Sequence, residues 1–186
     1  VRANTTYGQS IVSYTGTGSA ATVGHGITAP DLIMIKERSS TSGWVVYHSA
    51  LGATKYLSLH STAAESTSSN TFNDTEPTST VFSLLTSGGN NQSSQTYIAY
   101  CFSDVTGYSK FGSYSGNGSA TGPVVTLGFS PAFLLVKSSS AVEPWNIIDN
   151  TRNPTNPKPS VLTPNSSSAE VDTASGTGVD FTSTGF

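Results

Sequence analysis

The stretch Ser13-Tyr14-Thr15-Gly16-Thr17-Gly18-Ser19-Ala20 recurs one hundred residues later as Ser113-Tyr114-Ser115-Gly116-Asn117-Gly118-Ser119-Ala120, with six of the eight positions identical. Three further blocks recur in the same order, and the pairs are residues 30–36 with 131–137, 44–48 with 145–149, and 64–65 with 169–170. Repeated blocks in a fixed order indicate repeated structural units. The sequence therefore predicts two related copies of about 100 residues.

The two copies differ at their ends. After residues 81–85 the first copy passes through a polar turn at 87–95 into Thr96-Tyr97-Ile98-Ala99-Tyr100-Cys101-Phe102, whereas the second copy ends before any such run. We expect a first β repeat with an N-terminal strand over residues 1–106 and a second over residues 107–186 that lacks its last strand. The opening residues carry no targeting pattern, and both ends are expected to be boundaries of a fragment or of an ordered region.

Strand signals fill the chain. Short segments rich in Val, Ile, Tyr, Phe and Trp alternate with clusters of Gly, Ser, Asn and Pro, a pattern typical of sandwiches and barrels. We expect strands near residues 10–15, 31–37, 43–48, 55–60, 80–85, 96–103, 110–115, 122–127, 131–138, 144–149, 160–163 and 178–182. No long window carries an amphipathic helical stripe, so any helix should be one turn near residues 62–67. The predicted fold class is all-β, a β-sandwich of jelly-roll or concanavalin-A-like type.

The composition excludes several functions. Lys and Arg number only eight, the net charge is −3, and the basic residues are scattered, so nucleic acid is not an expected partner. No apolar run approaches the roughly 18 to 20 residues of a membrane span, so we expect no membrane insertion. The single cysteine, Cys101, excludes intrachain disulfides and a multi-cysteine zinc site, and its apolar neighbours indicate a buried small hydrophobe.

Four residues are candidates for contact with a surface glycan. Trp44 and Trp145 each begin an apolar strand after a loop, where an indole serves either to pack the core or to stack on a sugar. Asp149 ends the second of these strands, and Asn153 lies in the proline-rich run of residues 152–159, which is expected to be a surface loop. Lys36 and Lys137 close matched strands, which is typical of a solvated strand end or a protected edge.

No catalytic residue, metal site or cofactor is predicted. Glu65 and Glu170 would be the paired carboxylates of a retaining glycosidase, but equivalent positions in two copies normally lie far apart. Each is better interpreted as accepting local hydrogen bonds. His25, His48 and His60 have no second ligand at a chelating spacing. We therefore expect a protein that is not an enzyme.

The sequence resembles the tail-fibre-like or virion structural proteins of marine tailed bacteriophages. The stretches that carry the resemblance are residues 7–18, 51–57, 97–102, 107–114, 164–166 and 169–170. The resemblance implies a structural component of a virion, a tail-fibre or appendage domain with a host-surface adhesion role, on the surface of the extracellular particle. Its expected partners are other virion proteins, copies of itself in a homo-oligomer, and a host cell-surface glycan.

Other interpretations remain open. A capsid decoration or filament subunit would show a large interface at the termini, and a carbohydrate-binding module would expose Trp44 or Trp145 beside Asn and Asp in a groove. A glycan hydrolase would need Glu65 or Glu170 beside a second carboxylate. Because an unpaired sheet edge is a template for strand addition, we also expect residues 6–14 to supply the strand missing from the second copy, in cis or from a neighbouring subunit.

Overall fold

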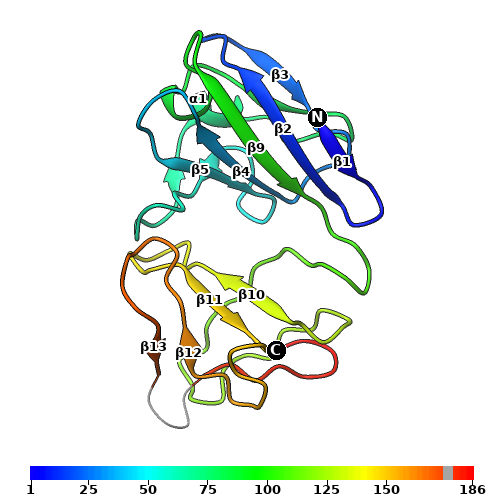
Figure 1. Ribbon diagram of the computed structural model, residues 1–186, viewed down its shortest axis with the longest axis vertical. Helices are drawn as coiled ribbons and strands as arrows, with labels where there is room; N and C mark the ends of the chain where they lie inside the picture. The colour runs from blue at the N-terminus through cyan, green and yellow to red at the C-terminus, as the bar shows by residue number, and fades with distance from the viewer. Residues whose placement is uncertain (174–177) are drawn as a thin grey trace.

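The computed structural model describes residues 1–173 and 178–186 and consists mostly of antiparallel strands (Figure 1). The N-terminal part forms the upper lobe of Figure 1 and the C-terminal part forms the lower one. Two single-turn helices, α1 (Ser69–Phe72) and α2 (Gly88–Asn91), are the only helices among the described residues. The predicted all-β class is therefore confirmed.

One five-stranded antiparallel sheet organises the N-terminal part. Its order is β1 (Arg2–Asn4), β2 (Gln9–Thr15), β9 (Thr96–Phe102), β4 (Leu32–Glu37) and β5 (Trp44–His48). The strand β9 lies in the middle, paired with β2 on one side and with β4 on the other. Its residues alternate between buried and half-buried, as expected for a central strand with one face on a core.

The buried face of this sheet packs against shorter elements. The strands β3 (Ala21–Gly24) and β8 (Val81–Leu84) form one pair, and β6 (Lys55–Tyr56) and β7 (Ser66–Thr67) form another. The core contains Phe72 from α1 and Phe82 from β8, packed with Tyr97 and Cys101 of β9. Cys101 is fully buried, which confirms its predicted role as a small core residue, and burial raises the pKa of its thiol to about 12.

The C-terminal part has fewer and shorter strands. The strand β10 (Phe133–Val136) pairs with β11 (Asn146–Asp149), and β12 (Ser160–Val161) pairs with β13 (Val171–Asp172). Isolated bridges join Thr126 to Gly185, Ile147 to Leu162, and Lys158 to Val179. This part therefore has little sheet with which to cover its apolar residues.

The two parts pack together around the indole of Trp145. Trp145 lies in a cluster with Leu32, Val46 and Leu57 of the N-terminal part, and its Nε1–H donates to the carbonyl of Ser58 at 3.0 Å. Two backbone hydrogen bonds add to this contact, and they run from the N–H of Glu65 to the carbonyl of Ser139 at 2.8 Å and from the N–H of Glu143 to the carbonyl of Thr62 at 2.9 Å. The contact combines apolar burial with directional bonds.

Several local predictions are corrected by the structure. No strand forms near residues 110–115, 122–127 or 178–182, where the described residues make only isolated bridges at Thr126 and Val179. The strands expected near 55–60 and 160–163 are only two residues long. The helical turn expected at 62–67 is wrong, because residues 66–67 form β7 and the helices lie further on.

The expectation that residues 6–14 complete the second copy in cis is also wrong. Most of this stretch belongs to β2, which is paired with β1 and β9 in its own sheet. Among the described residues, no helix has the length and apolar character needed to cross a membrane.

Candidate functional site

A polar hollow of about 280 Å³ opens where the chain enters β5. Its walls come from segments far apart in the sequence, namely the start of β5, the chain after β6, and the two short helices with their preceding residues. Two aromatic rings, one imidazole and several hydroxyl groups line it, and these are Trp44, Tyr56, His60, Ser42, Ser58, Thr71 and Ser87. Such a mixture of aromatic faces and hydroxyl groups suits a small polyhydroxylated ligand.

Trp44 is the aromatic wall of this hollow. It is half-buried at the first position of β5, opposite Lys36 of β4, and its ring centroid lies 6.1 Å from that of Tyr100 on β9, the strand on the far side of β4. Packing on Tyr100 limits the motion of the indole while part of its surface stays accessible. Trp44 is therefore partly accessible on one side and packed on the other.

His60 is fixed beside Trp44 by a backbone hydrogen bond. The N–H of Trp44 donates to Nδ1 of His60 at 2.9 Å, so the neutral imidazole carries its proton on Nε2 and presents a donor. Gly43 makes this arrangement possible, because a Cβ at that position would lie 1.9 Å from Cε1 of His60. The ring therefore occupies space that only glycine leaves free.

The loop that leads into the hollow is tied down by hydroxyl groups. Ser39 Oγ donates to Oε1 of Gln95 at 2.6 Å and accepts from the N–H of Thr96 at 2.9 Å, which anchors the loop to the start of β9. Ser40 Oγ donates to Oε1 of the buried Glu37 at 2.5 Å. These bonds order a serine-rich segment that would otherwise gain little from burial.

Trp145 does not belong to this surface. Its side chain is only 4% exposed and packs between the two parts of the chain. The prediction of a surface contact at Trp145 is corrected, because a buried indole has no free face for a ligand. The alternative interpretation of this residue, strand-end packing, describes what it does here.

Asp149 and Asn153 are occupied by local structure. Asp149 accepts from the backbone N–H of Arg152 at 2.9 Å and from its Nε at 2.6 Å, and these bonds lower the pKa of the carboxyl group below its usual value. Asn153 Oδ1 accepts from the N–H of Ser160 at 3.1 Å. Neither residue lines the hollow beside Trp44. Their contacts order the proline-rich loop rather than offering a prepared site.

The two equivalent glutamates are each bound to a cation. Glu65 pairs with Lys55, and Oε2 of Glu170 accepts from Nη1 of Arg152 at 2.6 Å. Arg152 also binds Asp149, so Glu170 shares its cation with a second carboxylate, whereas Glu65 pairs with Lys55 alone in these contacts. Within residues 1–173 and 178–186, no group of three or more His, Cys, Asp and Glu side chains is arranged to hold a metal.

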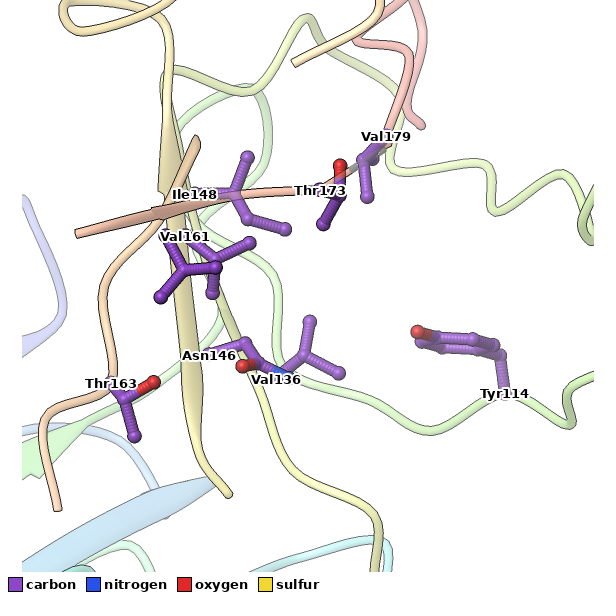
Figure 2. Close-up of a pocket in the computed structure, with 9 residues that line it drawn as sticks. Tyr114, Val136, Asn146, Ile148, Val161, Thr163, Thr173 and Val179 are labelled. Carbon is purple, nitrogen blue, oxygen red and sulfur yellow. The ribbon is translucent and has the colours of Figure 1, made fainter. Parts of the chain in front are cut away.

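A second hollow, of about 440 Å³, lies in the C-terminal part. Figure 2 shows Tyr114 on one side and Val136, Ile148 and Val161 on the other, with open space between them. The lining is largely aliphatic, so this hollow suits apolar side chains rather than a sugar. Sequence reasoning missed both hollows, because their walls converge only in the folded chain.

Comparison with known proteins gives one result. A family model described as a domain of unknown function (DUF7483) matches residues 1–186. No curated protein and no solved structure gives a significant match.

Proposed function

The chain belongs to the family described as a domain of unknown function (DUF7483), and we propose that it is a non-catalytic adhesion domain that binds a surface glycan in the hollow beside Trp44. The observation that carries the proposal is the half-buried indole next to His60 and a set of hydroxyl groups. An indole face packs against the C–H face of a sugar ring, while hydroxyl and imidazole groups bond to the sugar hydroxyls.

The size of the hollow indicates the mode of binding. At about 280 Å³ it lies just below the roughly 300–1,000 Å³ that small-molecule sites occupy, so it accommodates about one sugar unit. A single shallow contact of this kind is weak. Several copies acting together would hold a cell surface far more strongly than one copy does.

The proposed role is binding without turnover. Glu65 and Glu170, the carboxylates that a glycan hydrolase would use, are each engaged by a basic side chain, and neither lines the hollow. A general acid must reach the bond that it protonates, so neither carboxylate is placed to act on a ligand in this hollow. Placement in a virion appendage, with other virion proteins and copies of the chain as partners, belongs to the same proposal and is supported by the sequence resemblance.

The experiment is a titration of the full chain with sugars selected from a bacterial surface glycan array. We expect Trp44→Ala to weaken binding at least about tenfold, which corresponds to about 1.4 kcal/mol. Tyr108→Ala is the matched control, because Tyr108 is 49% exposed and packs on Tyr7 away from the hollow. Unchanged binding by Trp44→Ala, or equal losses in both variants, would exclude the hollow as the site.

Gly43→Ala gives a second, more local perturbation. The added methyl group must displace the imidazole of His60, so the donor at Nε2 moves while the indole stays in place. We expect weaker binding to glycans with little change in unfolding temperature. If this variant binds as the original chain does, His60 takes no part in recognition.

A further inference from the structure

The five-stranded sheet has an outer face that points away from the core of the N-terminal part. In its central strand β9, alternate residues Tyr97, Ala99 and Cys101 are fully buried in that core. The residues between them, Ile98 and Tyr100, therefore lie on the outer face. Figure 1 shows the strands of this sheet side by side in the upper lobe.

One row of outer-face residues leads across the sheet to Trp44. Ile98 of β9 faces Lys36 of β4, and Lys36 faces Trp44 of β5. The ring of Tyr100, two residues along β9 from Ile98, lies 6.1 Å from the indole. Two aromatic rings and one ammonium group therefore share a small area of this face, next to the hollow that Trp44 lines.

The C-terminal part covers only some rows of the outer face. The outer-face residues that pack in the cluster around Trp145 are Leu32, Met34, Val46 and Phe102. Among the described residues, neither Trp44 nor Ile98 belongs to that cluster, and Ile11, which faces Tyr100 from β2, is 48% exposed. The rows that carry the two aromatic rings and Lys36 are therefore open to a partner.

The open part of this face is basic, although the chain is acidic. The net charge is −3, with 11 acidic residues against eight Lys and Arg. Glu37 is the only acidic residue in the five strands, and it is buried on the opposite face. The exposed Arg38 continues the alternation of Lys36 on the outer face, because its N–H still donates to the carbonyl of Thr96 at 2.7 Å.

Neither of these two cations has a carboxylate partner. The ion pairs formed within residues 1–173 and 178–186 use Lys55, Lys110 and Arg152. Nζ of Lys36 donates to the carbonyl of Glu37 at 2.8 Å, which engages one of the three donors of an ammonium group. An anion that approaches this face meets two positive charges and no negative side chain of the five strands.

We propose that the outer face binds an acidic glycan, whose carboxylate groups pair with Lys36 and Arg38 while its sugar rings pack on Trp44 and Tyr100. The proposal rests on the proposed glycan site, because Trp44 belongs both to the hollow and to this face. A polymer of uronic acids supplies C–H faces for aromatic rings together with a negative charge on each sugar. A nucleic acid fits this face less well, because two cations neutralise few phosphates.

The test titrates the full chain with three polysaccharides that contain uronic acids, namely alginate, polygalacturonate and hyaluronan, each beside its carboxyl-reduced form. Reduction turns every carboxylate into a neutral hydroxymethyl group and keeps the sugar rings. We expect saturable binding of at least one acidic polymer, and binding at least about fivefold weaker after its reduction. Added salt should weaken binding of the acidic form, because it screens exposed charges.

Single substitutions locate the charge contact. Lys36→Gln and Arg38→Gln should each weaken binding of the acidic polymer about threefold and leave binding of the reduced polymer unchanged. Lys110→Gln is the matched control, because it removes the same charge from a side chain that pairs with Asp104 outside the outer face. Equal effects of Lys36→Gln and Lys110→Gln would contradict a contact at Lys36.

The remaining outcomes separate this inference from the proposed function. Neutral glycans that bind through Trp44, with no preference for carboxylates, would overturn the inference and leave the proposed function intact. Binding that Trp44→Ala leaves unchanged, or no binding of any glycan, would overturn both. Tighter binding of dextran sulfate would assign the face to sulfate groups, and tighter binding of a thymidine oligonucleotide would assign it to nucleic acid. Either result would contradict the proposed uronic acid ligand.

Discussion

Replacing Trp145 with alanine should destabilise the whole chain, because this indole joins the two parts. The side chain is 4% exposed, packs on Leu32, Val46 and Leu57, and donates to the carbonyl of Ser58. A tryptophan buries about 150–250 Å², which at about 25 cal/mol per Å² gives an upper estimate of about 4–6 kcal/mol. Measured losses for buried Trp→Ala changes are about 3–5 kcal/mol. We therefore expect a loss of about 4 kcal/mol, equivalent to a fall in Tm of about 8–16 °C for a domain of this size.

The assay is urea denaturation followed by circular dichroism, with Trp44→Ala as the matched control. Trp44 holds the equivalent position in the first block of sequence but is half-buried, so its removal should cost less than about 1.5 kcal/mol. A loss below about 1 kcal/mol for Trp145→Ala would refute the reasoning. So would two separate transitions with the N-terminal one unchanged, since the parts would then unfold independently.

Three smaller predictions concern pH and packing. Burial lowers the pKa of His25, whose Nε2 donates to the carbonyl of Thr78. The folded chain therefore binds fewer protons than the unfolded chain, and its stability should fall as the pH falls below about 6.5. In melting curves from pH 7.5 to 5, His25→Gln should reduce this loss. Hydrogen bonds from Arg152 lower the pKa of Asp149, so Asp149→Asn should lower the Tm at pH 7. The difference in Tm between this variant and the original chain should vanish as the folded carboxyl group is protonated below about pH 3.9. Gly16→Ala should lower the free energy of unfolding by about 1–3 kcal/mol in urea titrations, because the added Cβ would lie 2.2 Å from the carbonyl oxygen of Gln92. Gly116→Ala is the control, because its Cβ meets no atom within 4 Å and the change should be nearly neutral.

The strands that the sequence located at nearly full length have four or more residues. The strands β2, β4, β5 and β9 run for five to seven residues, and each lies where the sequence placed one. The strands β1, β7 and β13 have two or three residues, too few for a periodic signal. The length of a strand, more than the type of its residues, decided whether the sequence could locate it.

Residues 110–115 show why a strand-like pattern is not sufficient. Ser113 and Tyr114 repeat Ser13 and Tyr14 of β2 exactly in sequence, yet only the earlier pair lies in a strand. The earlier pair faces Ile98 and Tyr97 of β9. A strand needs a partner to bond its backbone, and the C-terminal part offers none there among the described residues. Pairing is a property of the fold that a local window does not contain.

For a related reason, the sequence identified Trp44 as a candidate for the site but not the residues that surround it. Trp44 and Trp145 occupy equivalent sequence positions, so no local feature separates the accessible indole from the buried one. Their difference arises because the C-terminal part docks its tryptophan against Leu57 and Ser58 of the N-terminal part. The hydroxyl groups and imidazole around Trp44 come from separate segments, and only the folded chain brings them together.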